Sequence, residues 1–490
     1  MGHGDLALAV DEAVRAGAAY VDARHVADEA ERIVARNGQV ERVSHDTSEG
    51  VGVRALVDGA WGFGCAPGLD PAAIAGAART AVGIARAAAT LRRAPVSLAE
   101  TPPAHGDYRT PCVIDPFTVP TAQKCDLAVR ASEAAHQSPL VRSSEVFLSA
   151  RRQWKRFVSS EGANATHDLV VTAAGLNVVV AEGDEVESRS YPFEAVGSYR
   201  AAGYEFIEGL DLVSAAPRVV DEAIEILRAP DCPAGRTTLI VGSAQLALQI
   251  HESCGHAVEL DRVLGTEVSL AGTSFIRPDD LGRLAYGSDK VSIVADATCE
   301  GGLGTFAFDD DGVAATRTPI VERGKLVGFL TSRETAAQLG LDARGVIGGT
   351  MRAESWNRFP LIRMVNVNLE SGEGSLEDLI RDTDDGMFVD GFRSWSIDDR
   401  RLNFHFACQV AWEVKNGRLT RRLRNPVYTG VTPEFWRSCD AVAGASEWRL
   451  WGLAQCGKGD PAQLVGVGHG AAPARFRNVE VGSGHRGGRS

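Results

Sequence analysis

Apolar and polar positions in the first 230 residues follow two periods, which predicts a mixture of helices and strands. Helical spacing or propensity marks residues 6–17, 71–91, 124–136 and 216–227. Alternating or β-branched runs predict strands at residues 20–26, 32–43, 169–181 and 185–190. The run at 32–43 contains Asn37-Gly38, a favoured two-residue hairpin turn. We therefore expect a mixed α/β segment that ends near residue 230, where a turn-like stretch containing Pro and Gly follows.

After residue 230 the pattern changes to short apolar runs separated by turn signals at 322–325 and 415–418, which predicts strands and hairpins. One stretch differs, because the strand-like run TTLIV leads into helical spacing over 244–260, with Ser243 as the expected N-cap. The predicted fold class is α+β. It has an N-terminal mixed α/β domain over 1–230, a β-rich C-terminal domain over 231–480 that carries this helix, and a disordered low-complexity tail over 481–490.

The helix predicted at 244–260 carries the pattern HExxxH, in which His251, Glu252 and His256 are the defining residues. It is one residue longer than the HExxH of common zinc proteases. At about 100° per residue, a regular helix separates the two imidazoles by about 140°. Both can reach one metal only if the turn widens locally, as in a π-bulge, or if the helix loosens just before His256, and Gly255 is well placed for such a distortion. Glu252 falls between the histidines, where it could act as a general base on a metal-bound water.

The remaining residues of this helix divide into a polar and an apolar face. Glu259 lies on the polar face and could steady a histidine without binding the metal itself. The apolar stripe consists of Leu246, Ala247, Ile250, Cys254 and Val258. Cys254 is therefore interpreted as a buried, inert thiol, although a nucleophile beside two histidines is the alternative.

Two imidazoles leave a metal under-coordinated, so a third protein ligand is needed, with a fourth position left for water. Cys456 is the candidate. It stands in the turn-rich stretch QCGKGDP, which is expected to expose the thiol, and Lys458 is close enough in sequence to favour the thiolate. The competing interpretation is a loop cysteine without a role.

Composition and charge limit the classes of molecule that this protein is expected to bind. The 64 acidic residues exceed the 51 basic ones and leave a net charge of −13, so no basic field favours nucleic acid. No window approaches the roughly 18 apolar residues that cross a bilayer. The nine cysteines never form a CxxC pair, and Asp5 and Asp11 interrupt the stretch where an export signal would lie. These features predict a cytoplasmic protein with neither nucleic acid nor membrane as its partner.

Several blocks of the sequence resemble the TldD/PmbA family of zinc metalloproteases, in the same order along nearly the whole chain. The blocks are 20–24, 50–63 (GVGVRALVDGAWGF), 251–261 (HESCGHAVELD), 308–330, 360–366 (PLIRMVN) and 456–468 (CGKGDPAQLVGVG). In that family the TldD-type subunit carries HExxxH and the PmbA-type partner lacks it, so this chain resembles the TldD type. One departure lies at 346–352, where VIGGTMR replaces a Gly-Asn-Gly-Arg stretch of many relatives and leaves the substrate specificity open.

The resemblance implies Zn²⁺ held by His251, His256 and Cys456, with Glu252 as general base. It also implies that the N-terminal domain contributes to a dimer, either a homodimer or a heterodimer with a PmbA-type subunit, around an enclosed site that admits unfolded peptides. The predicted function is hydrolysis of amide bonds in small or unfolded peptides. Two alternatives stay open: an amide hydrolase acting on a peptide-like natural-product intermediate, and a non-catalytic peptide-binding module that its zinc holds folded.

Overall fold

The fold combines long sheets with helices of short and medium length, which confirms the predicted α+β class. The computed structural model describes residues 6–193, 197–270, 272–341 and 348–484. The α-helices are α1 (Leu6–Arg15), α2 (Pro71–Ala89), α3 (Thr121–Ala134), α4 (Tyr204–Gly209), α5 (Leu212–Arg228), α6 (Ser243–Ile250), α7 (Leu260–Leu264), α8 (Arg333–Leu339), α9 (Leu376–Arg381) and α10 (Thr432–Arg437). Within the described ranges, no helix is long and apolar enough to span a membrane.

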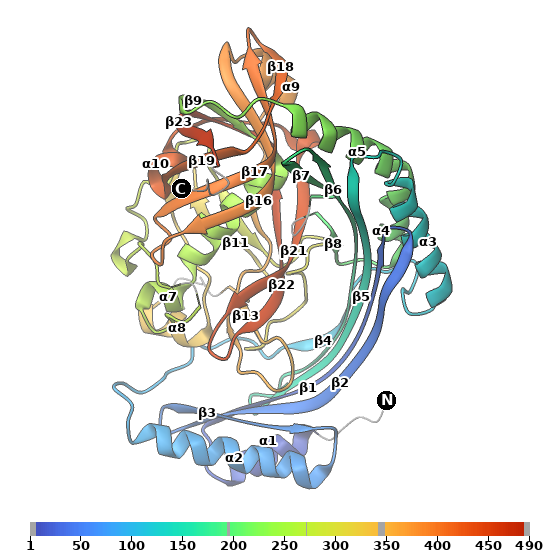
Figure 1. Ribbon diagram of the computed structural model, residues 1–490. Helices are drawn as coiled ribbons and strands as arrows, with labels where there is room; N and C mark the ends of the chain where they lie inside the picture. The colour runs from blue at the N-terminus through green and yellow to red at the C-terminus, as the bar shows by residue number, and fades with distance from the viewer. Residues whose placement is uncertain (1–5, 194–196, 271, 342–347, 485–490) are drawn as a thin grey trace.

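A long curved sheet dominates the N-terminal half, with strand order β3-β2-β1-β5-β6-β4 and with β7 and β8 also paired to β6. Its strands are β1 (Tyr20–Arg36), β2 (Gln39–Val57), β3 (Ala60–Pro67), β4 (His105–Arg109), β5 (Val141–Ser159), β6 (Asn164–Glu182), β7 (Glu185–Tyr191) and β8 (Tyr199–Arg200). Helices α3 and α5 lie on its convex side and the C-terminal half lies on its concave side (Figure 1). Helices α1 and α2 cover the end formed by β2 and β3.

The hairpin predicted at Asn37-Gly38 is confirmed, because β1 and β2 join there and both turn residues have positive φ. The strand that enters this turn is longer than predicted. Residues 27–31 belong to β1, although their polar sequence favours no strand. They are held in place because β1 pairs with β2 on one side and with β5 on the other along almost its whole length.

The C-terminal half contains a second large sheet, with order β16-β9-β23-β19-β17-β18 and with β20 paired to β23. Because β16 also pairs with β17, the strands from β16 to β17 along this path close into a ring. The strands of this half are β9 (Gly235–Val241), β10 (Ile293–Asp296), β11 (Arg317–Glu322), β12 (Lys325–Leu326), β13 (Met351–Arg352), β14 (Leu361–Ile362), β15 (Val367–Leu369), β16 (Asp385–Ile397), β17 (Asn403–Lys415), β18 (Arg418–Leu423), β19 (Pro426–Val431), β20 (Cys439–Val442), β21 (Arg449–Lys458), β22 (Gln463–Ala471) and β23 (Ala474–Ser483). The hairpins predicted at 322–325 and 415–418 are confirmed as β11–β12 and β17–β18.

The change from the first sheet to the second falls where the sequence pattern changes. Helix α5 ends at Arg228 and β9 begins at Gly235, on either side of residue 230. The division into domains over 1–230 and 231–480 stays a prediction. At the C-terminal end, β23 runs to Ser483, and residues 485–490 of the expected tail lie outside the described residues.

Candidate metal centre

The helix that carries HExxxH follows directly from β9, whose last three residues are buried. Helix α6 begins at Ser243, but the Ser243 side chain makes no capping hydrogen bond, so the predicted N-cap is wrong. The side chain of Asp390, on β16, caps the helix instead. Its Oδ1 accepts a hydrogen bond from the backbone N–H of Gln245 at 3.0 Å. Burial raises the pKa of Asp390 to about 6. The first turn of α6 is thus tied to a strand of the ring, which fixes the direction of the helix.

The local widening predicted for HExxxH is confirmed. Residues His251–Gly255 form a π-helical turn in which the backbone N–H of His256 donates to the carbonyl of His251. The two imidazole rings consequently lie with their centroids 4.8 Å apart and nearly perpendicular. At position 255 an added Cβ atom would overlap the side chain of Met364, so any residue other than glycine requires Met364 to move. The extra residue of the motif is therefore absorbed by the backbone.

The candidate ligand atoms of His251, His256 and Cys456 all lie within 4.8 Å of one another, and the three residues are buried. Cys456 Sγ is 3.7 Å from His256 Nε2. The expectation that a loop exposes this thiol is wrong, because Cys456 lies in β21 and is 1% exposed. Pairing of β21 with β22 places the thiol over the π-helical turn, from 200 residues away in sequence.

Hydrogen bonds to the outer ring nitrogens decide which nitrogen of His251 is available to a metal. The carbonyl oxygen of Val367 can only accept, so His469 Nδ1 donates to it at 3.0 Å. Burial holds the pKa of His469 well below its usual range, which leaves its Nε2 as an acceptor. His251 Nδ1 donates to that atom at 2.8 Å. The lone pair of His251 Nε2 is left free by this arrangement.

His256 is oriented in the same way by a carboxylate. Its Nδ1 lies 3.1 Å from Glu259 Oε2, and Nε2 faces Cys456. Burial alone would raise the pKa of Glu259, but Lys458 and His256 outweigh it and hold the pKa well below the usual range. Lys458 Nζ lies 3.3 Å from Glu259 and 2.8 Å from Asp261. Glu259 is therefore an ionised acceptor behind His256.

The cation that favours the Cys456 thiolate differs from the one expected. Burial raises the pKa of Cys456, but His256 and Arg363 outweigh it and bring the pKa below its ordinary value. Arg363 is fully buried and donates to the backbone carbonyl of Cys456. The assignment of this effect to Lys458 is corrected, because Lys458 is engaged by the two carboxylates behind His256.

Glu252 lies beside the cluster and is held by an arginine that the sequence analysis missed. Arg401 Nη1 donates to Glu252 Oε2 at 2.6 Å, and both residues are buried. Arg401 occupies a turn between β16 and β17 with φ of 61°. Asp398 holds this turn by accepting hydrogen bonds from the backbone N–H groups of residues 400, 402 and 403. Glu252 is thus held by a turn of the ring of strands that lies next to the π-helical turn.

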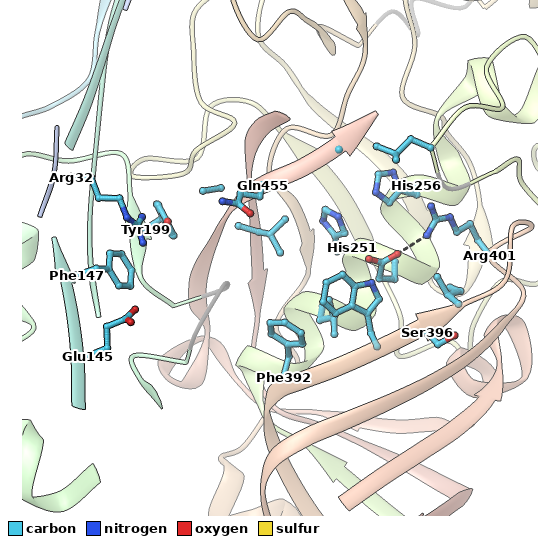
Figure 2. A pocket seen from close by; sticks show the side chains of 18 residues that line it. Arg32, Glu145, Phe147, Tyr199, His251, His256, Phe392, Ser396, Arg401 and Gln455 are labelled. Atoms are coloured by element: carbon cyan, nitrogen blue, oxygen red, sulfur yellow. Dashed lines mark hydrogen bonds and ion pairs between the residues drawn. The ribbon is translucent and has the colours of Figure 1, made fainter. Parts of the chain in front are cut away.

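These groups face a cavity of about 670 Å³ between the two halves of the chain. His251, His256 and Arg401 line one side (Figure 2). Glu252, the partner of Arg401, also lines the cavity. Arg32, Glu145, Phe147 and Tyr199, all from the N-terminal sheet, line the other side, with Gln455 between (Figure 2). The space is large enough for a peptide-like ligand to lie against the histidines.

Cys254 is buried and turned away from this cavity, as the helical pattern predicts. Burial raises the pKa of its thiol to about 12, which opposes a role as nucleophile. The sequence analysis missed His469, Arg363 and Arg401. The block that resembles the family around Cys456 ends at Gly468, one residue before His469, and the block 360–366 contains Arg363, whereas no such block contains Arg401.

Family models match most of the chain. Models described as PmbA/TldA metallopeptidase match residues 21–85 with domain 1, residues 114–229 with the central domain and residues 234–483 with the C-terminal domain.

Several relatives and solved structures are similar to this chain over nearly the full length of both chains. A metalloprotease from Methanothermobacter thermautotrophicus is 28% identical over 94% of this chain and 95% of its own. A zinc metalloprotease TldD homolog from Saccharolobus solfataricus is 23% identical over 96% of this chain and 98% of its own. The crystal structure of TldE from Thermococcus kodakarensis has a TM-score of 0.67 at 16% identity and covers 97% of this chain and 100% of its own. A Thermotoga maritima protein, whose name proposes a modulator of a DNA gyrase, has a TM-score of 0.73 at 18% identity and covers 96% of this chain and 98% of its own.

Proposed function

Because this chain belongs to the TldD/PmbA family, we propose that it is a zinc-dependent peptidase that hydrolyses amide bonds of small or unfolded peptides. The observation that carries the proposal is the buried cluster of His251, His256 and Cys456, with Glu252 beside it in the wall of a large cavity. The names metalloprotease and zinc metalloprotease given to the relatives support the same reaction and metal.

The donor set fits zinc on chemical grounds. Two imidazole nitrogens and a thiolate are soft and borderline ligands that suit Zn²⁺, and three protein ligands leave one position for water or substrate. Each histidine has its outer nitrogen engaged, by His469 or by Glu259, so that the inner nitrogen can bind a metal. Cys456 is already biased toward the thiolate.

Each residue in and around the cluster has a distinct role in the proposed reaction. Zinc bound there would supply a Lewis acid that polarises the scissile carbonyl and lowers the pKa of water toward neutrality. Glu252 accepts the proton of the attacking water and passes it to the leaving amine. Arg401 engages Oε2 of Glu252 and so orients the carboxylate toward the cavity. Cys456 donates more negative charge than a third imidazole would, which moderates the acidity of the water.

The N-terminal sheet encloses the site from the opposite side. Arg32, Phe147 and Tyr199 face the histidines across the cavity, which supports a role of residues 1–230 in enclosure. HExxxH supports assignment to the TldD type. We place the protein in a dimer, either with a second copy or with a PmbA-type subunit, in which residues 1–230 contribute to the interface.

Replacement of the general base tests this function. Glu252→Gln keeps the shape of the side chain but cannot accept a proton, so kcat on an unstructured peptide should fall by about 10²- to 10⁴-fold. Peptide cleavage followed by mass spectrometry and zinc content of the purified protein give the two readouts. Zinc content should stay at the wild-type level.

Cys254→Ala is the matched control, because it removes a buried thiol that lies in the same π-helical turn but does not line the cavity, and it should leave turnover nearly unchanged. Wild-type turnover in Glu252→Gln would remove Glu252 from the mechanism.

A further inference from the structure

A second cavity adjoins the one that contains the histidines. It has a volume of about 230 Å³ and shares Tyr199 and Ala454 with the larger cavity. Ala454 lies on β21 two residues before Cys456, so this strand borders both spaces. A ligand that lies along β21 can therefore reach from the metal cluster into the second cavity.

The charged side chains that line the second cavity are all positive. They are Arg151 and Arg352, accompanied by the neutral polar residues Thr110, Ser149, Gln153 and Thr305. Arg151 is neutralised by Asp28, whose Oδ1 lies 2.7 Å from its Nη2. Within the described part of the chain, Arg352 has no carboxylate within 4 Å.

Arg352 is held by backbone carbonyls instead. Its Nη1 donates to Met364 at 3.0 Å and to Gly466 at 2.7 Å, and its Nη2 donates to Leu303 at 3.2 Å. These acceptors fix the plane of the guanidinium without cancelling its charge. Arg352 is half-buried, and a charge that is partly removed from water in a protein is normally paired with an opposite charge.

The surroundings of Arg352 add to the positive potential. Burial and the neighbouring Arg363 lower the pKa of Arg352 to about 10, against the opposing effects of Asp310 and Cys456. The carboxylate of Asp310 is already engaged by Lys155 at 2.6 Å. An anionic group of a ligand would therefore gain from entering this space.

We propose that the second cavity binds a carboxylate of the peptide substrate and that Arg352 is the residue that pairs with it. This inference rests on the proposed peptidase function. The carboxylate can come from the C-terminus of the peptide or from an acidic side chain near the scissile bond. Leu169, Val171 and Leu303 line the same space and favour a short apolar group beside the carboxylate.

Matched peptides test the carboxylate. One sequence is prepared with a free C-terminal carboxylate, with a C-terminal amide, and with a single Glu near the C-terminus exchanged for Gln. Dissociation constants are measured by fluorescence anisotropy on the Glu252→Gln protein, in which turnover of the peptides should be strongly reduced. A charge-assisted hydrogen bond should make one acid form bind about 10- to 100-fold more tightly than its neutral counterpart. The form that shows the difference identifies the source of the carboxylate.

Variants of the protein test Arg352. In Arg352→Gln the preference for the acid form should shrink to less than about 3-fold, while the affinity for the neutral peptide changes little. Arg352→Lys should restore part of the preference. The matched control is Arg32→Gln, which removes a cation from the larger cavity and should keep the preference.

Two results would overturn the inference: equal binding of acid and neutral peptides to the protein with Arg352 intact, or loss of the preference in Arg32→Gln instead of Arg352→Gln. If Arg352→Gln does not fold, the inference is tested by comparing acid and neutral peptides on the protein with Arg352 intact and on Arg352→Lys. Failure of the proposed function looks different, because the wild type would then cleave none of the peptides, whatever their affinity.

Discussion

At the scale of single residues, His469 shows how a side chain outside the ligand set controls the cluster. It receives a hydrogen bond from His251 and passes one to the carbonyl of Val367, and all three groups are buried. A histidine ligand usually donates its second N–H to a carboxylate, a carbonyl or water. Here an imidazole takes that place, so the orientation of His251 depends on the protonation state of His469.

We expect His469→Ala to weaken zinc binding by about 10- to 100-fold, because His251 loses the acceptor that fixes its ring and its tautomer. Competition with a chromogenic chelator measures the zinc affinity. His469→Gln can offer an amide oxygen to His251 and should recover part of the loss. His405→Ala, at an exposed histidine of β17, is the control. Unchanged affinity in His469→Ala would show that His251 needs no partner.

At the scale of elements, the helix with HExxxH brings its two histidines together because it is irregular. α6 ends at Ile250, a π-helical turn follows over His251–Gly255, and a 3₁₀ turn continues over His256–Val258. The π-helical turn rotates the imidazole of His256 back toward that of His251. A motif with one residue more than HExxH can thus present both histidines to one point.

Gly255→Ala should disturb this turn, because the added methyl group overlaps the buried side chain of Met364. We expect a loss of about 1–3 kcal/mol in the free energy of unfolding, together with a lower zinc content. Urea denaturation and metal analysis measure the two effects.

The double variant Gly255→Ala with Met364→Ala relieves the overlap and should recover zinc binding. Gly76→Ala in α2, where no atom lies within 4 Å of the added Cβ, should be neutral or slightly stabilising. Normal stability and zinc content in Gly255→Ala would show that the turn tolerates a side chain.

At the scale of the whole molecule, buried ion pairs join the N-terminal sheet to the C-terminal half. Arg54 of β2 lies 2.6 Å from Asp22 of β1 and 2.6 Å from Asp311. Lys155 of β5 lies 2.6 Å from Asp310. Both walls of the cavity that the histidines line depend on this junction, since one wall comes from each half.

Removal of Asp311 should therefore destabilise the protein strongly. Asp311→Ala leaves Arg54 buried with one partner fewer, and we expect a loss of about 3–5 kcal/mol in the free energy of unfolding. Urea denaturation measures it. The control is Glu41→Ala, which breaks an exposed pair with Arg36 and should cost less than about 1 kcal/mol. Equal effects of the two variants would exclude a special role of the buried pairs.

The same junction predicts sensitivity to acid through His167. This side chain of β6 accepts a hydrogen bond from the backbone N–H of Phe308 at 3.4 Å. Burial and the nearby Lys155 lower the pKa of His167 to about 3 against the opposing effect of Asp310. The unfolded chain takes up this proton near pH 6.5, so the stabilisation is complete above that pH and is lost on acidification toward pH 3.

His167→Gln should reduce the acid sensitivity of stability by up to about 1.4 kcal/mol per pH unit between pH 6 and 4. Denaturant midpoints over this range measure it. His405→Gln, at an exposed histidine, should leave the slope unchanged. Parallel pH profiles of the wild type and His167→Gln would contradict the assignment.

The sequence by itself determined the features that repeat over a few residues. The step from β9 into the helix, the widened turn at Gly255, the burial of Cys254 and the hairpin turns all follow from spacing within about one or two turns of chain. Periodicity and turn chemistry are local, and they leave their trace in adjacent residues.

Cys456 was already a candidate ligand from the sequence, but only the tertiary structure decided which distant groups meet at the site. Cys456 comes to His256 from 200 residues away, His469 to His251 from 218 and Arg401 to Glu252 from 149. Arg352 and Asp390 are likewise placed by strands that pair elsewhere. Such contacts are set by sheet pairing and by packing between the two halves of the chain. These long-range interactions produce no periodic pattern of apolar and polar positions around any of these residues.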